Sequence, residues 1–405
     1  MSTEMIGALL DGPGTGAAEP DLPAQRLLYD GRLGDLYRIF VENLLLGIVT
    51  FGIYRFWGRT RYRRYLWSHT AFDGDRFEYT GTGGELFRGF LIAIGIFFAG
   101  IVGLVLAQIF FGESHPILVG VVTIGFYGFL FFILFAAHFT ALRYRLTRTR
   151  WRGIRGGLAG SATAYAWRNI GYGLLTILTL SQYQPFATMR LIGYRVNNLF
   201  FGTAKANFDG RGRDVYGRYL ITFLLSLLIF VLFLGGVAVV PYGMLSVDEI
   251  ASIKDMFDWA MEDGGISEDE WQFLLQYTEL RRLLEWLPFI IIGFVLIWPL
   301  LVLFVNCWYL QRLVSYVAAR SEIAGLRFVG DVTTGRLAKL VGINFLLLIF
   351  TFGIGYPVVL NRLWRFAGDS FVILGKVDGA LIAQSQLATP SRGEGFLEVL
   401  DPGMV

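Results

Sequence analysis

Four long apolar stretches without a charged residue constrain the fold of this chain more than any other feature. They cover Gly89–Gly112, Pro116–Leu142, Tyr219–Gly243 and Leu287–Leu310. A helix needs about 20 mostly apolar residues to cross a bilayer, and each stretch is longer than that. Buried helices of this length in a water-soluble protein carry a polar face, which these stretches lack. They therefore predict four transmembrane helices.

Composition agrees with an all-α integral membrane protein. Hydrophobic residues make up 55% of the chain and charged residues only 17%, whereas a soluble domain has about 25% charged residues. The single cysteine, Cys307, excludes an intramolecular disulfide. We expect a membrane domain over 27–378, a disordered lead-in without signal-peptide features over 1–26, and a tail over 379–405.

Charges in the linkers predict the orientation. Arginines follow the second apolar stretch with no acid among them, whereas the insert 244–286 is strongly acidic. Lys and Arg near span ends mark the cytoplasmic side, so both termini are expected inside and the insert outside. Within the insert, amphipathic patterns predict short helices over Ile250–Met261 and Asp269–Leu284. We interpret the insert as a solvated cap rather than an ion site.

A segment with the same landmark residues occurs three times, near 31–81, 151–210 and 326–378. The spacing from glycine to asparagine is nine residues in each copy, and a threonine and a tyrosine follow. Internal repeats determine the fold of many chains. The landmarks are Gly34, Asn43, Thr50 and Tyr54, then Gly160, Asn169, Thr179 and Tyr183, then Gly335, Asn344, Thr351 and Tyr356.

Length and charge disfavour these copies as full spans. The first has only about sixteen residues between Arg38 and Arg55, fewer than a span needs. If the copies are short re-entrant or interfacial segments, the chain crosses four times and every basic linker lies inside. If each copy crosses, the count is seven, and the third copy, over Leu340–Leu360, is long enough. We favour four crossings.

Short surface hairpins are expected after the first two copies, because Phe72–Gly81 and Phe201–Gly210 alternate and contain glycine.

Polar residues at membrane depth are the candidate functional residues, because a polar group in hydrocarbon must find a partner. Glu42 is a candidate because carboxylates in membrane segments are often functional, although Arg38 lies one helical turn away. For the asparagines, a structural role is favoured over a solute or ion pathway. The candidates for the turn or pathway are Glu42, Asn43, Thr50, Tyr54, Asn169, Thr179, Tyr183, Asn344, Thr351 and Tyr356.

A basic, aromatic segment follows the turn in each of the three copies, and in the second it runs from Pro185 to Arg195. Tryptophan and tyrosine lie well at headgroup level, and arginine attracts anionic lipid. The candidate headgroup residues are Trp57, Arg59, Arg61, Arg63, Arg64, Arg362, Trp364 and Arg365. Plain anchoring to membrane lipids is favoured over recognition of a specific lipid.

Enzyme chemistry is not indicated. The three histidines, His69, His115 and His138, lie far apart and match no metal-ligand spacing. No phosphate-binding loop, nucleophile elbow or dinucleotide fingerprint occurs, so we expect no catalytic residue, metal or cofactor. The net charge of +3 gives no basic field that indicates nucleic acid. A second copy of the chain or an envelope protein remains open as a partner.

The stretch from Leu28 to Gly81 resembles the YjgN family of uncharacterised multi-pass inner-membrane proteins of bacteria. The resemblance is carried by Tyr29-Asp-Gly31, by Thr50-Phe-Gly-Ile-Tyr54 and by the arginine-tyrosine run that ends at Tyr65, with Trp151-Arg-Gly-Ile as a further match. The second copy departs from the pattern, since Ser181-Gln182 replaces the Gly-Ile pair. The resemblance implies a bacterial inner-membrane location and supplies no activity.

Two hypotheses for the function remain. The first is transport of a small solute or lipid, because transporters often contain repeated units with broken helices at the binding site. The second is a non-transporting membrane scaffold or a protein that organises the envelope.

Overall fold

The computed structural model describes residues 23–244, 297–377 and 383–384, together with isolated residues between 248 and 293. Residues 1–22 of the expected lead-in and most of the acidic insert, with nearly all residues of its two expected helices, therefore lie outside the described residues. The prediction of a disordered lead-in over 1–26 is wrong at its end, because Ala24–Arg26 form a strand.

Among the residues that the structure describes, four helices are long and apolar enough to cross a membrane, one at each of the four predicted spans. In the most apolar 18-residue stretch of each of these helices, at most 17% of the residues are buried inside the protein. Apolar side chains so exposed need lipid around them. These helices are α4 (Gly83–Phe111), α5 (Pro116–Arg148), α8 (Arg213–Met244) and α12 (Trp298–Ala319).

Three pairs of shorter helices form hairpins, which we call the short hairpins. They are α2 (Leu33–Val49) with α3 (Arg55–Ser68), α6 (Ala162–Leu178) with α7 (Gln184–Val196), and α13 (Thr334–Phe350) with α14 (Tyr356–Ser370). The alternative of a single spanning helix over Leu340–Leu360 does not match the structure, because a turn over 351–355 interrupts this stretch.

The all-α prediction is incomplete, because eleven strands form a single sheet whose paired neighbours are all antiparallel. The edge strands β1 and β2 are separated in sequence by Leu27 alone, so the sheet curls until it nearly closes into a barrel. The strands are β1 (Ala24–Arg26), β2 (Leu28–Tyr29), β3 (Thr70–Phe72), β4 (Asp75–Tyr79), β5 (Thr149–Trp151), β6 (Ile154–Leu158), β7 (Leu199–Phe201), β8 (Ala204–Phe208), β9 (Ser321–Ile323), β10 (Leu326–Gly330) and β11 (Phe371–Leu374).

Two-residue turns connect the strands of the four β-hairpins. The turns Asp73–Gly74, Arg152–Gly153 and Ala324–Gly325 have positive φ at both residues, the geometry that suits the twist of a tight hairpin. The predicted hairpins β3–β4 and β7–β8 exist. They are not separate surface elements as expected, because they join the common sheet together with β5–β6 and β9–β10, which the sequence analysis missed.

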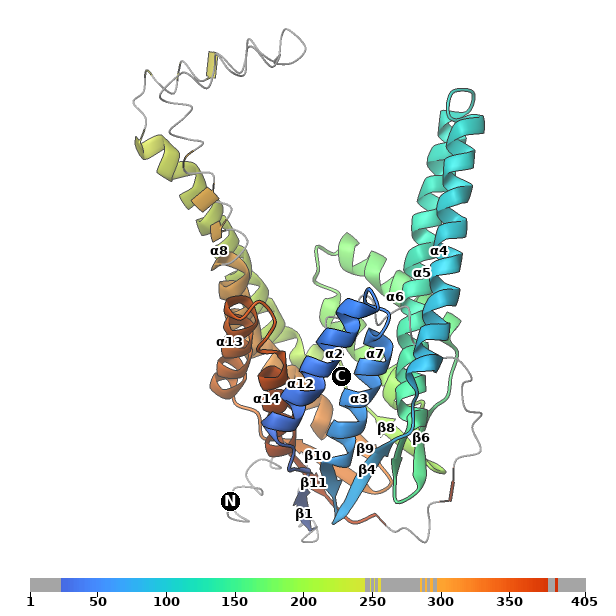
Figure 1. Ribbon diagram of the computed structural model, residues 1–405. Helices are drawn as coiled ribbons and strands as arrows, with labels where there is room; N and C mark the ends of the chain where they lie inside the picture. The colour runs from blue at the N-terminus through green and yellow to red at the C-terminus, as the bar shows by residue number, and fades with distance from the viewer. Residues whose placement is uncertain are drawn as a thin grey trace.

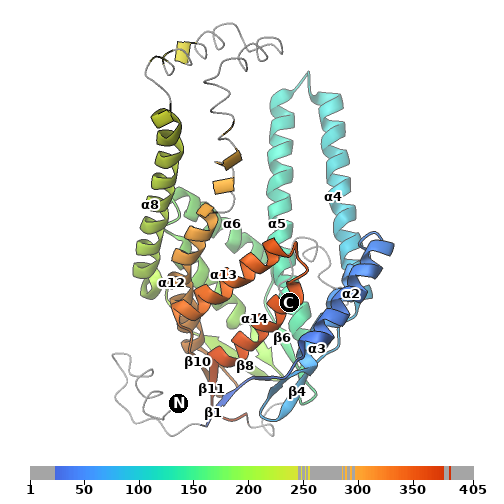
Figure 2. The same ribbon diagram turned by 60° about the vertical axis from the view of Figure 1, so that its left-hand side comes forward.

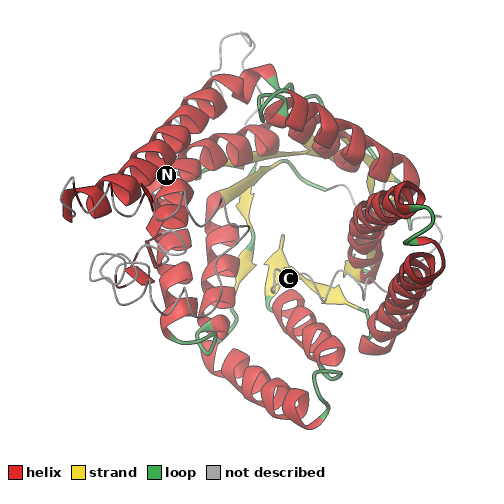
Figure 3. Cartoon of the chain, turned by 90° about the horizontal axis from the view of Figure 1, so that it is seen from above, coloured by secondary structure: helices red, strands yellow, loops and turns green. Residues whose placement is uncertain are grey.

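The helices stand as a ring of pairs on this sheet (Figure 1). Short hairpins and long pairs alternate between successive β-hairpins, and contacts between α14 and α2 close the ring. Figure 3 shows this ring from above. In Figures 1 and 2, α4 and α5 rise well beyond the short hairpins.

Apolar side chains fill the interior of the sheet. The buried residues Phe72, Trp151, Leu326 and Ile373, from four different strands, form one cluster, and Phe201 packs against it. The indole nitrogen of Trp151 donates to the carbonyl oxygens of Phe72 and Asp75, each at 3.2 Å. Burial of these large side chains stabilises the curled sheet.

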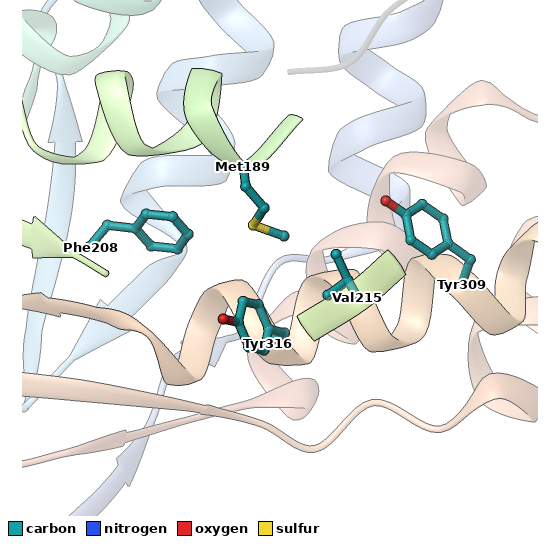
Figure 4. Close-up of a cluster of buried hydrophobic side chains, with 5 residues drawn as sticks. All are labelled: Met189, Phe208, Val215, Tyr309 and Tyr316. Carbon is teal, nitrogen blue, oxygen red and sulfur yellow. The ribbon is translucent and has the colours of Figure 1, made fainter. Parts of the chain in front are cut away.

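A second cluster fixes α7 and β8 to the long helices α8 and α12 (Figure 4). It consists of Met189, Phe208, Val215, Tyr309 and Tyr316.

Candidate functional site: the three short hairpins

Each short hairpin is organised by a threonine directly after a 17-residue helix. The hydroxyl of Thr50 donates to the carbonyl oxygen of Leu46 at 2.7 Å and accepts from the backbone N–H of Tyr54 at 3.0 Å. Thr179 makes the same two bonds, at 2.8 Å to Leu175 and 3.0 Å from Tyr183. The two carbonyl oxygens also accept from the backbone N–H of the threonine itself, so the hydroxyl is needed chiefly by the N–H at the start of the second helix, which has no partner within that helix. The predicted turn role of these threonines is therefore visible in their contacts.

In the third hairpin the step from threonine to tyrosine is five residues instead of four, as the sequence shows. Thr351 donates to Leu347 at 2.6 Å, but the N–H that bonds to its hydroxyl, at 2.8 Å, belongs to Gly355. Tyr356 therefore lies one residue beyond the position that Tyr54 and Tyr183 occupy.

Two residues after each threonine adopt the left-handed conformation. The φ angles are 50° and 85° at Phe51 and Gly52, and 48° and 85° at Phe352 and Gly353. In the second hairpin the corresponding angles are 49° at Leu180 and 70° at Ser181. Glycine adopts this region freely, whereas a residue with a Cβ is strained there. The Ser181-Gln182 departure thus preserves the turn at an energetic cost.

The tips of the three hairpins are apolar and exposed. Phe51 is 97% exposed, Leu180 is 79% exposed and Phe352 is 96% exposed. On the adjoining turns Val49, Leu178 and Phe350 are 74%, 78% and 76% exposed. Groups of large apolar side chains on a surface mark contact with a membrane or another protein.

Contacts with the long helices fix the height of these tips. The hydroxyl of Tyr219, where the apolar stretch of α8 begins, donates to the carbonyl oxygen of Ser181 at 2.6 Å. In the first hairpin Trp57 packs against the start of α4, since a Cβ on Gly83 would lie 2.7 Å from its Cα atom. The first two hairpins therefore lie beside the sheet-proximal ends of the spans.

The predicted asparagines do not form one equivalent set. Arg32 precedes α2 and Thr333 precedes α13, and the asparagines Asn43 and Asn344 each lie eleven residues further on. In the second hairpin Ser161 precedes α6, and the residue eleven positions after it is Tyr172. Asn169 is therefore out of register by one helical turn.

The three asparagines also make different contacts. Asn43 donates to the carbonyl oxygen of Gly58 at 3.3 Å across the hairpin, and Asn169 donates to Tyr165 of its own helix at 2.8 Å. Asn344 is 6% exposed, and its Oδ1 atom has no hydrogen-bond partner.

Glu42 forms ion pairs with two arginines. Arg61 of α3 reaches Glu42 across the hairpin, and Arg38 bonds to it at 3.1 Å. The hydrogen bond from Arg61 contributes most to lowering the pKa of Glu42, and the hydrogen bond from Arg38 contributes next. Glu42 is thus an ionised partner of these arginines, and its geometry indicates a role in holding α2 to α3.

The predicted headgroup residues on α3 differ in their surroundings, because Arg63 is buried, Arg59 and Arg61 are half-buried, and Trp57 and Arg64 are exposed. Arg63 is 2% exposed and donates to the hydroxyl of Tyr79 at 3.1 Å, and Arg64 donates to the carbonyl oxygen of Gly81 at 2.9 Å. On α14, Trp364 donates to Thr70 at 2.8 Å. These side chains hold the helices to the sheet.

Arg362 is half-buried and Arg365 is exposed. Arg168 and Arg190 of the second hairpin were not among the candidate headgroup residues, although Arg190 lies in the predicted basic segment of that copy. In the structure Arg168 stacks on Tyr194, and Arg190 stacks on Tyr172 and Tyr183. The step of seven residues from Tyr183 to Arg190, which Tyr54 to Arg61 shares, is the signal that could have added Arg190 to the candidates.

Ion pairs at the sheet hold its closing strands. Asp30, which follows β2, pairs with Arg76 of β4 at 2.5 Å, and this hydrogen bond lowers the pKa of Asp30 from 3.8. Arg152 pairs with Asp75 at 2.5 Å and with Asp73 at 3.0 Å. Within the part of the chain that the structure describes, no group of three or more His, Cys, Asp or Glu could hold a metal ion.

Comparison with known proteins extends over nearly the whole chain. A family model described as "Bacterial protein of unknown function (DUF898)" matches residues 24–399. The chain is 36% identical to the "Inner membrane protein YjgN" of Escherichia coli strain K12 over 81 residues, which is 20% of each chain. It is 28% identical to the protein of that name in Salmonella typhimurium strain LT2 over 177 residues, or 43% of this chain and 41% of the relative. The alignments thus span less than half of either relative. No solved structure matches the chain significantly.

Proposed function

The chain belongs to the DUF898 family of bacterial proteins, and from that premise we propose that it is a non-transporting protein of the bacterial inner membrane that organises the lipid leaflet next to its sheet. The four long helices cross the bilayer, while the three short hairpins enter only the near leaflet. The termini and the sheet face the cytoplasm. The proposal assigns no catalysis and no cofactor.

The exposed apolar tips of the short hairpins are the observation that carries this proposal. Phe51 and Phe352 are 97% and 96% exposed, and contact with acyl chains would cover them at about 1.5–3 kcal/mol for each side chain. The tip at Ser181 lies where the apolar stretch of α8 starts. Only the near leaflet would therefore contain the hairpins, and the protein would occupy more area in that leaflet than in the other.

Chain topology supports shallow hairpins over full crossings. Each short hairpin begins and ends at strands of one sheet. A segment that crosses once would deliver the next strand to the opposite side of the membrane, where it could not pair with its neighbours. The arginine-rich strands β5 and β6 also belong on the cytoplasmic side, where Lys and Arg gather.

The alternative, a transport pathway, has one observation in its favour, the unpartnered Oδ1 atom of the buried Asn344. Unsatisfied buried polar atoms are uncommon, and some are functional. Against a pathway through the ring, the apolar cluster around Trp151 and Leu326 fills the interior of the sheet.

Environment-sensitive labels at the tips test where the hairpins lie. Single cysteines replace Phe51, Leu180 and Phe352 in a Cys307→Ser background, are labelled with a fluorophore, and the protein is placed in liposomes. Quenchers attached near the lipid headgroup should quench all three labels more than quenchers at the bilayer centre. Labels that emit as in water would contradict insertion, and stronger quenching at the bilayer centre would contradict a shallow position.

Sorting by curvature tests the organising function. Protein reconstituted with its sheet outward in vesicles of mixed diameter should concentrate in the smallest, because its outer leaflet needs the most area there. The triple change of Phe51, Leu180 and Phe352 to serine should abolish the enrichment. Equal density at all diameters, or solute flux that Asn344→Leu stops, would refute the proposal.

A further inference from the structure

Two arginines line the seam between the helices of the second short hairpin. The guanidinium carbon of Arg168 on α6 lies 4.2 Å from the ring centroid of Tyr194 on α7. One turn along, the order is reversed, and Arg190 of α7 lies 5.7 Å from the ring centroid of Tyr172 on α6. Residues four apart on a helix are neighbours, so each helix presents one arginine and one tyrosine to the seam. The two positive charges therefore share one face of the hairpin, with about one helical turn between them.

No carboxylate neutralises this pair among the described residues. The sequence contains no Asp or Glu between Glu113 and Asp209, and Asp209 is paired with Arg320 at 3.2 Å. Arg190 donates instead to the hydroxyl of Tyr183 at 2.5 Å. Stacking on tyrosine holds each guanidinium in place but leaves its charge uncompensated.

The first hairpin offers a contrast within the same molecule. Arg61 lies eleven residues after Thr50, as Arg190 lies eleven after Thr179. Arg61 likewise donates to a tyrosine hydroxyl, that of Tyr54, at 3.4 Å. Here, however, Glu42 forms an ion pair with the arginine. The same position therefore carries an internally paired charge in one hairpin and a charge available to a ligand in the other.

We propose that the seam between α6 and α7 binds the phosphate of an anionic phospholipid, with Arg168 and Arg190 as the donors. Guanidinium groups match the geometry of phosphate oxygens, and Arg is favoured for this recognition. Leu178 and Leu180, 78% and 79% exposed, would lie beside the acyl chains of the same lipid. A zwitterionic headgroup binds less well, because its cationic end meets uncompensated arginines. The site rests on the proposed function only in that the hairpin lies at the membrane surface.

Retention of defined lipids by the purified protein tests the site. The full-length chain in detergent is mixed with phosphatidylglycerol or phosphatidylcholine, and bound lipid is counted by native mass spectrometry. Wild type should retain phosphatidylglycerol preferentially. Arg168→Gln and Arg190→Gln should each weaken this retention by about tenfold, the loss expected when one charge-assisted hydrogen bond is removed. The lysine variants at both positions should retain part of it and should match wild type in thermal stability.

The first hairpin supplies matched controls. Arg61→Gln should leave retention unchanged, because Glu42 already occupies that arginine. Glu42→Gln should free Arg61 and add a second bound phosphatidylglycerol. Equal retention of both lipids by wild type, or no loss in the Arg168→Gln, Arg190→Gln double variant, would overturn the site. Binding of inorganic phosphate that blocks no lipid would overturn it as well.

The label at position 180 distinguishes failure of the lipid site from failure of the proposed function. If the label at position 180 inserts but phosphatidylglycerol is not preferred, the lipid site is wrong and the proposed function survives. If the label does not insert, the proposed function fails.

Discussion

Replacement of the turn threonines by valine should destabilise each short hairpin by about 2 kcal/mol. Valine has the shape of threonine without the hydroxyl. In Thr50→Val the carbonyl oxygen of Leu46 keeps its bond from the backbone N–H of residue 50, at 3.0 Å. The N–H of Tyr54 loses the acceptor at 3.0 Å, and an N–H left unsatisfied in a partly buried site costs about 1–3 kcal/mol.

Unfolding of the purified protein in mixed micelles, followed by tryptophan fluorescence, measures this loss. Thr50→Ser keeps the hydroxyl and should stay within about 0.5 kcal/mol of wild type, as surface changes generally do. Thr176→Val is the matched control, because the Thr176 hydroxyl donates to Tyr172 at 2.8 Å within its own helix, and such a bond contributes little. The reasoning is refuted if Thr50→Val is as stable as wild type, or if Thr176→Val is equally damaging.

Four further predictions follow from single contacts. Ser181→Gly should stabilise the protein by about 1 kcal/mol in the same unfolding assay, because it removes a Cβ from a φ of 70°; no gain would contradict strain at this turn. Arg76 lowers the pKa of the Asp30 carboxyl group, so the ionised carboxylate should hold β2 in place at neutral pH and release it as the pH falls below about 4. Faster amide exchange in β2 at low pH would show the release, and Asp30→Asn should abolish this pH dependence. Asn344→Leu should leave stability unchanged or raise it, because it removes an unpartnered buried oxygen; a loss above about 2 kcal/mol would reveal a missed partner. Gln384→Ala should speed proteolysis of the tail, since the side chain of Gln384 bonds to Gly153 and Arg155 at 3.0 and 3.1 Å; an unchanged rate would contradict this anchor.

The sequence was most informative where one physical requirement acts over many residues. The first three spans were predicted to within about two turns, because crossing a bilayer requires a long apolar run. The fourth helix ends at Ala319, nine residues beyond the predicted Leu310. The threonines were recognised as turn residues because a helix break near a membrane needs a local hydrogen-bond partner. Their exact contacts then follow from the position directly after the helix.

The sheet was missed because six of its eleven strands have only two or three residues, which is too short for a periodic signal. β3, β5 and β9 have three residues each, and the hydrophobic alternation of a strand needs at least four to be read. The usable signal was the turn. Asp73–Gly74, Arg152–Gly153 and Ala324–Gly325 each place glycine at the second position of a two-residue loop, a strong local indicator of a hairpin.

The asparagine register failed because the copies were aligned on glycine rather than on the start of the helix. Gly34 and Gly335 lie two residues after the residue that precedes their helix, whereas Gly160 lies one residue before Ser161. The side chain of Ser161 caps its helix by accepting from the N–H of Ala164 at 3.3 Å. Counting from such a cap would have placed Tyr172, and with it the partner of Arg190, at the position of Asn43.

The sheet also constrains how the membrane segments can vary. Because successive strands pair with each other around one ring, every helical segment between them must return to the side from which it started. Helix pairs can therefore be long or short, but a single crossing cannot be inserted without breaking the ring. The helix pairs can therefore differ in two independent properties, the length of their apolar stretch and the charges near their tip. In the first short hairpin Glu42 pairs with Arg61, whereas the second contains no acid that could pair with Arg190, and the proposed anion site depends on this difference.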